Sequence, residues 1–242
     1  MNLPQQTEID WFQEARRVLQ SAQRVVVLTG AGISAGSGVP ISQVNHSSVS
    51  FLTTTTTESF VRDPRTVWKQ HKELRQRLTD RKPNAAHLAL VEWFAKKPHL
   101  LFTQNIDGLH EASGHPRVRA LHGTLWANRC TACGNVRPDR NAAYNGLTYS
   151  RCCGALERPH IVWVGDFLND TDLDAAKMAV ELCDVLLVIG TSGTVAPVSR
   201  FARRVMDCKR IVIEVNPEPS GFVPSTICIE QAAEDALPSL LR

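Results

Sequence analysis

Apolar residues near the start of the chain recur at helical spacing and then give way to a continuous apolar run. Between positions 10 and 22 they stand three or four residues apart, which predicts an amphipathic helix; they are Trp11, Phe12, Ala15, Val18, Leu19 and Ala22. Residues 24–29 form a valine-rich run that ends at glycines. Such a run predicts a strand that is buried on both faces, as in a parallel sheet.

Comparable apolar runs recur along the chain, with helical patterns between them. The runs lie at residues 99–103, 184–190 and 210–215, and the helical patterns at residues 84–96 and 173–182. Strand, turn and helix in alternation indicate an α/β fold with a doubly wound parallel sheet.

Two segments interrupt this alternation. Residues 41–83 begin with a polar stretch and become helical from about Pro64 to Leu78, and residues 126–154 are rich in turns and carry four cysteines. We expect both to be insertions that pack together as a smaller lobe. The predicted main domain then comprises residues 1–40, 84–125 and 155–242.

The composition is that of a globular chain of 242 residues, 43% hydrophobic and 21% charged. A net charge of +3 without a basic block gives no reason to expect nucleic-acid binding. The apolar runs are too short to span a membrane, and the first ten residues do not resemble a signal peptide. Seven cysteines, an odd number, fit a reducing compartment. We therefore expect a soluble, cytoplasmic protein. The sequence does not give its oligomeric state, and a monomer is the working assumption.

A glycine turn follows the first predicted strand. The pattern Gly30-x-Gly32-x-x-Ala35 matches the dinucleotide-binding fingerprint, in which the second glycine lets backbone N–H groups approach a pyrophosphate. The alternative is a purely structural turn between a strand and a helix. The acidic residue expected about 20 positions later is missing, because Leu52 stands there. This absence argues against an ordinary dehydrogenase.

Polar side chains follow the next predicted strand, at the edge where open α/β sheets bind ligands. Gln104, Asn105 and Asp107 could hold ribose hydroxyls and a carboxamide, although a capped polar turn would also explain them. His122 follows another apolar stretch. It could act as a general base or be structural.

The cysteines indicate a metal site. Cys130 and Cys133 form half of a zinc knuckle, and Cys152 and Cys153 supply a second pair. Zinc ribbons usually place about two residues between ligands, and Ser150 stands where a partner of Cys153 would fall. The sequence predicts one structural zinc site and leaves open whether Cys152 or Ser150 completes it. The other cysteines are typical of small buried hydrophobes: Cys183, Cys208 and Cys228.

Together and in this order, the motifs resemble those of the sirtuin family. The matching blocks are GAGISAGSGVP at residues 30–40, PNAAH at 83–87, TQNIDGLH at 103–110, HG at 122–123, RPHIVWVGD at 158–166, GTS at 190–192 and VNPEP at 215–219. The resemblance runs from about residue 24 to the end of the chain. It implies a Rossmann-like NAD-binding domain whose smaller lobe consists of a helical and a zinc-ribbon insertion, and the activity of an NAD-dependent protein lysine deacylase.

The resemblance also implies roles for single residues. His122 would be the catalytic base, and Asn105 would be a second catalytic residue. The NAD-binding residues would be Gly30, Ala31, Gly32, Ser34, Gln104, Asn105, Ile106, Asp107, Gly190, Thr191, Ser192, Asn216 and Glu218. The substrate peptide would add a strand between two segments that contain Val162, Trp163, Val164 and Gly165 in one and Thr194 and Val195 in the other.

In the implied chemistry NAD is consumed as a co-substrate. The carbonyl oxygen of an acylated lysine on a protein substrate attacks C1′ of the nicotinamide ribose and displaces nicotinamide. His122 then removes a proton from a ribose hydroxyl, and the oxygen of that hydroxyl attacks the carbon of the former acyl carbonyl group. Water completes the release of free lysine and O-acyl-ADP-ribose, and zinc is only structural.

Departures from the family pattern bear on activity and specificity. No Phe-Arg pair follows Pro40, so closure over NAD and exclusion of water are weakened. The Tyr-x-x-Arg pair of enzymes that remove acidic acyl groups is replaced by His71 and Leu74, with Arg75 adjacent. We therefore expect removal of acetyl or longer neutral groups rather than succinyl. Milder changes are Val164 and Asp166, where Phe and Glu are more common.

Three alternatives compete with the deacylase. An NAD glycohydrolase or ADP-ribosyltransferase of the same fold would follow if water or another acceptor took the ADP-ribose. An inactive protein that binds NAD or ADP-ribose is a second, although such a binder has no need of a base at His122. A zinc-dependent hydrolase is disfavoured, because no histidine-rich open metal site lies near the glycine turn.

Overall fold

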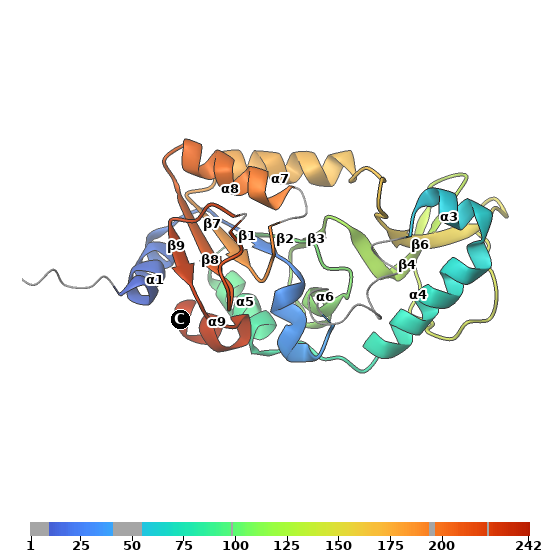
Figure 1. The fold of residues 1–242 in the computed structure, drawn as a ribbon, viewed down its shortest axis with the longest axis horizontal. Coiled ribbons are helices and arrows are strands. Elements are labelled where there is room, and N and C mark those ends of the chain that lie inside the picture. The colour runs from blue at the N-terminus through green and yellow to red at the C-terminus, as the bar shows by residue number, and fades with distance from the viewer. Residues whose placement is uncertain (1–9, 41–54, 98, 194–196, 222) are drawn as a thin grey trace, which may run out of the picture.

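A six-stranded parallel sheet forms the centre of the computed structural model, which describes residues 10–40, 55–97, 99–193, 197–221 and 223–242 (Figure 1). The strand order is β3-β2-β1-β7-β8-β9, so the chain builds outward from β1 in one direction and from β7 in the other. The strands are β1 (Val25–Thr29), β2 (Leu100–Thr103), β3 (Val118–Ala120), β7 (Val185–Ile189), β8 (Ile211–Val215) and β9 (Ile227–Ile229). The sheet reverses its order between β1 and β7, the place where such sheets bind ligands.

Helices cover both faces of this sheet, which explains the unbroken apolar runs of β1 and β7. Val25 and Val27 pack on one face, and Val26 and Leu28 on the other, as the alternation of side chains along a strand requires. The first face is covered by α1 (Trp11–Ser21), α5 (Ala85–Lys96) and α9 (Ala233–Leu240), and the second by α7 (Asp170–Leu182) and α8 (Val198–Asp207). Short helices follow two strands: η1 (Ala31–Ser37) and α6 (Leu109–Ala112).

A smaller lobe lies beside the β3 edge of the sheet, on the right of Figure 1. Its antiparallel sheet has the order β5-β4-β6. The core contains Trp68, Leu125 and Trp163, all buried. The elements are α3 (Thr57–Arg62), α4 (Pro64–Leu78), β4 (Gly123–Cys130), β5 (Val136–Pro138) and β6 (Glu157–Ile161). The predicted fold class is therefore confirmed.

Within the described ranges, none of the helices is both long and apolar enough to cross a membrane.

Candidate functional site

The glycine turn after β1 packs directly on the backbone after β7. The amide of Gly30 donates to the Ile189 carbonyl at 2.9 Å, and that of Gly32 to the Gly190 carbonyl at 2.7 Å. A Cβ atom at Gly32 would lie 2.7 Å from the Gly190 Cα atom, so no larger residue fits. The Gly32 amide itself is therefore hydrogen-bonded within the protein. This glycine serves the close approach of two chain segments at the switch point of the sheet.

The residues after β2 bind this turn through side chains. The Asn105 amide group donates from Nδ2 to the Gly30 carbonyl at 3.1 Å and to Ser34 Oγ at 3.2 Å. Ser34 in turn donates to Asp107 Oδ2 at 2.8 Å. Burial raises the pKa of Asp107 above its ordinary value, although the Leu109 amide and Ser34 hydroxyl act in the opposite direction. The result is a connected polar wall.

Gln104 extends the wall toward β7 and β8. Thr191 Oγ1 donates to Gln104 Oε1 at 3.0 Å, and Asn216 Nδ2 donates to the Thr191 carbonyl at 3.1 Å. The ends of β2, β7 and β8 are thereby joined. Of the other predicted residues, Ile106 and Ser192 are partly buried, and Ala31 and Glu218 are exposed.

His122 lies immediately before β4 and contacts the same wall. Its Nδ1 atom is 3.0 Å from the Gln104 carbonyl oxygen. A carbonyl only accepts, so Nδ1 carries the hydrogen and the neutral ring keeps its lone pair on Nε2. Burial lowers the pKa of His122 below its ordinary value, with a smaller opposing effect from the Gln104 hydrogen bond. The ring is therefore held in the tautomer that a general base requires.

The predicted peptide-binding segment begins beside His122. The Val162 amide donates to the His122 carbonyl at 3.0 Å. Trp163 is buried, whereas Val164 and Gly165 are exposed. Thr194 and Val195, predicted to lie on the other side of the peptide, are outside the described residues.

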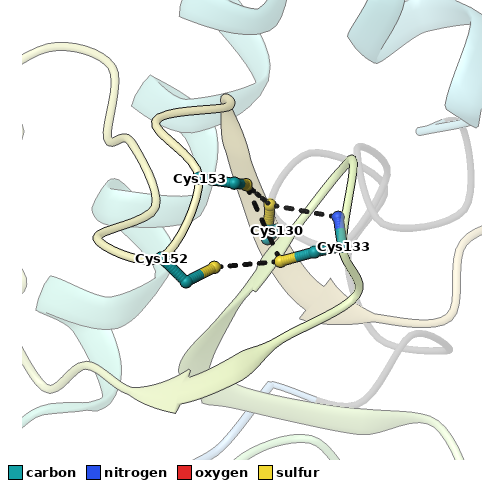
Figure 2. Close-up of side chains that lie close together, drawn as sticks. All are labelled: Cys130, Cys133, Cys152 and Cys153. Carbon is teal, nitrogen blue, oxygen red and sulfur yellow. Dashed lines mark hydrogen bonds between the residues drawn. The ribbon is translucent and has the colours of Figure 1, made fainter.

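All four predicted cysteines gather at one point of the smaller lobe, where Figure 2 shows their sulfur atoms facing one another. The Sγ atoms lie within 4.8 Å of one another. A ZnS₄ tetrahedron with Zn–S bonds of about 2.3 Å has sulfurs about 3.8 Å apart, close to the 3.4 Å between Cys130 and Cys153 and the 3.7 Å between Cys133 and Cys153. These residues fit one structural zinc ion.

Cys152 belongs to this cluster although it adjoins Cys153 in the sequence. Residues 151–153 form a turn, closed by the Gly154 amide donating to the Ser150 carbonyl at 2.9 Å, and both thiols belong to the cluster. Ser150 Oγ instead lies 2.9 Å from Cys152 Sγ. The four sulfur atoms form one group that could hold a metal ion, which favours Cys152 as the fourth of the predicted ligands.

One supporting residue was given no function from the sequence. Asn84, the N-cap of α5, donates from Nδ2 to the Ile33 carbonyl at 2.8 Å and so holds the glycine turn from the helix side. The sequence signal that could have identified this residue is its place at the start of the helical pattern at residues 84–96, where an asparagine is a preferred N-cap.

The sheet order, the polar residues at its switch point and the four-cysteine lobe are those of an α/β nucleotide-binding protein with an insertion that could hold a metal ion. The model of the Sir2 family matches residues 30–197. A Thermus thermophilus NAD-dependent protein deacylase is 38% identical over 221 residues, 88% of this chain and 87% of that protein. The chain belongs to the Sir2 family.

Solved structures agree in fold. A mutant Sir2 homologue in complex with ADP-ribose has a TM-score of 0.88 at 31% identity, covering 95% of both chains. A complex of Sir2 with a p53 peptide and NAD⁺ has a TM-score of 0.82 at 25% identity, covering 93% of this chain and 95% of that one.

Proposed function

We propose that the chain is an NAD-dependent protein lysine deacylase that converts NAD and an acylated lysine into nicotinamide, O-acyl-ADP-ribose and free lysine. The observation that carries this proposal is His122, a neutral imidazole whose Nε2 lone pair is left for a proton beside the polar wall at the switch point of the sheet. A protein that only binds NAD has no use for such a base. The name of the Thermus relative and the peptide bound in the Sir2 complex support the same activity.

The polar wall suggests how NAD is held as a substrate. Ser34, Asn105 and Asp107 form a preorganised chain of hydrogen bonds at the end of β2, suited to the nicotinamide ribose. Asn216 donates from Nδ2 to the Thr191 carbonyl and to the Glu214 carboxylate. Its side-chain oxygen is therefore left to accept from the adenosine ribose. The remaining residues assigned to NAD are Gly30, Ala31, Gly32, Gln104, Ile106, Gly190, Thr191, Ser192 and Glu218.

His122 has one chemical task in this scheme. After nicotinamide has left, Nε2 accepts the proton of a ribose hydroxyl as that oxygen attacks the acyl carbon. The proton resides on the ring and can be returned when the lysine amine departs. Zinc takes no part, because four thiolates would leave it no open position.

The smaller lobe favours neutral acyl groups. Arg75, which follows the position that marks acidic-acyl removal, is completely buried. Its guanidinium donates to the Leu125 carbonyl at 2.6 Å, to Asp139 Oδ2 at 2.8 Å and to Asn128 Oδ1 at 3.0 Å. A guanidinium already paired in this way does not offer a charge to a succinyl carboxylate. We therefore propose acetyl or longer neutral acyl substrates.

Mass spectrometry of the products from NAD with acetyl, butyryl and succinyl peptides tests this function. We expect O-acyl-ADP-ribose and free lysine in equal amounts with the two neutral peptides, and at least tenfold slower turnover of the succinyl peptide. Nicotinamide release that is independent of peptide, without acyl-ADP-ribose, would overturn the deacylase and favour a glycohydrolase. The missing Phe-Arg pair after Pro40 makes this the second candidate.

A further inference from the structure

The peptide-binding segment is a closed turn. The Asp166 amide donates to the Trp163 carbonyl at 3.0 Å, and Gly165 has a φ of +86°. These features define a type II β-turn over residues 163–166, in which the third position needs a positive φ. The Val164 amide donates to the Thr55 carbonyl at 3.3 Å. No bond within the described residues uses the Gly165 amide, which leaves it for a peptide.

The Asp166 carboxylate closes this turn and binds two other elements. Oδ2 accepts from the Trp163 amide at 3.3 Å and from Arg158 Nη2 at 2.8 Å. Oδ1 accepts from the Thr57 hydroxyl at 2.8 Å. One side chain thus joins the turn to β6, through Arg158, and to the first turn of α3, through Thr57.

Arg158 completes the arrangement from the other side. Its guanidinium carbon lies 3.5 Å from the centre of the Trp163 ring, and Nη2 also donates to the Ile161 carbonyl at 2.8 Å. The Trp163 ring in turn packs against Phe60 of α3, with ring centroids 5.3 Å apart. The turn is therefore held through both its backbone and its buried tryptophan.

Two open cavities of about 310 and 1040 Å³ border the turn, and both are lined by Arg158, Asp166 and Phe167. The Phe167 side chain is 95% exposed. Space for a peptide therefore adjoins the residues that hold the turn.

We propose that Asp166 is a positioning residue for the acylated peptide: with Thr57 and Arg158 it fixes the 163–166 turn against α3, so that the peptide-binding edge and the helical insertion form one unit. This inference rests on the proposed function and adds to it. Among the described residues these three form no hydrogen bond with the NAD wall, and they are linked to His122 through the Val162 amide and through the pairing of β6 with β4. The consequence is an effect on peptide affinity that is separate from NAD affinity.

Steady-state kinetics of Asp166→Asn and Thr57→Val test the proposal. Asp166→Asn removes the charge and puts an amide where at least one acceptor is needed, so we expect KM for an acetyl peptide to rise about tenfold. KM for NAD and kcat should change less than twofold. Thr57→Val, which removes only the hydroxyl, should raise the peptide KM about threefold, and Thr57→Ser should restore it.

Asp174→Asn is the matched control, since it breaks an exposed ion pair with Lys177 and should change nothing. If Asp166→Asn fails to fold, the peptide KM values of Thr57→Val and Thr57→Ser test the proposal in its place. An unchanged peptide KM in folded variants overturns the proposal, as does a parallel loss of kcat and NAD affinity. Fluorescence anisotropy with a labelled acetyl-lysine peptide and NAD separates the two hypotheses, because weaker binding by the variants supports the role of Asp166 even if the wild type proves not to be a deacylase. A wild type that does not bind the peptide contradicts both.

Discussion

The tautomer of His122 is set by one backbone contact, and its charge by burial. The Gln104 carbonyl accepts a hydrogen bond from Nδ1, which fixes the hydrogen there. Burial of the ring away from water disfavours the charged imidazolium form. Gln104 itself donates its backbone N–H to the Thr29 carbonyl at 2.9 Å, so the base is anchored to β1. A histidine alone is a weak indication of a catalytic base. The hydrogen bond to Gln104 and the burial of the ring are what suit His122 to that role.

The pH dependence of the reaction follows from this environment. A pKa below the ordinary value of about 6.5 keeps His122 neutral above that pH, so kcat/KM is flat there and falls as pH drops through the lowered pKa. His122→Ala should lower kcat by roughly 10²- to 10⁴-fold and leave NAD affinity within about threefold. His160→Gln, the control, should retain the acidic limb. Strong residual deacylation in His122→Ala would assign the base elsewhere.

Strand β4 connects the chemistry to the cysteine cluster. His122 precedes its first residue, Gly123, and Cys130 is its last. The strand also pairs with β6, which leads into the 163–166 turn. A metal that fixes the far end of β4 therefore stabilises both the base and the peptide edge from a distance.

Loss of zinc should consequently act through stability first. Cys133→Ser removes one of four ligands, and we expect zinc content to fall from one ion per chain to well below one. We also expect the free energy of unfolding to fall by about 3 kcal/mol, which corresponds to a Tm lower by roughly 6–12 °C for a chain of this size. Metal analysis and thermal unfolding measure the two effects, with Cys208→Ser, outside the cluster, as the control. Full stability of metal-free protein would argue against a structural metal.

Several histidines of the whole molecule are buried outside the site. His87, His99 and His115 have pKa values lowered to about 4, chiefly by burial, and their rings contact those of Phe94, Trp93 or His110. In the unfolded chain each would titrate near 6.5. Their neutral forms therefore contribute stability that is complete above about pH 6.5 and is lost as pH falls toward 4.

The free energy of unfolding should decline steeply across that window. Each such histidine adds a slope of about 1.4 kcal/mol per pH unit, so His115→Phe should reduce the total slope by up to that amount. Urea unfolding at pH 4.5, 5.5 and 7.0 measures it, and an exposed substitution such as Asp174→Asn should leave the slope unchanged. A wild type equally stable at pH 4.5 and 7.0 would mean that these rings are accessible to solvent.

Much of the fold and part of the candidate site could be predicted because local patterns specify them. Continuous valine runs identified β1 and β7, and helical spacing identified α4 at its observed bounds. The strands of the smaller sheet were not predicted: in β6 the inward positions include Glu157 and Pro159, so hydrophobic alternation does not mark it. The proposed domain bounds and the roles of the NAD-binding residues stay predictions.

By itself, the sequence determined the order of strands, turns and helices and the residue types that follow each strand, because both depend on neighbours within a few positions. It also determined the family, because the motifs that identify the family are short and occur in a fixed order. Only the tertiary structure decided that Cys152 joins the other three sulfur atoms, that the Gly32 amide pairs with Gly190, and that Arg75 is paired within the core. Each of these depends on a partner 19 to 158 residues away in the chain. Which of several chemically suitable partners a polar group meets is set by packing, and local sequence does not encode it.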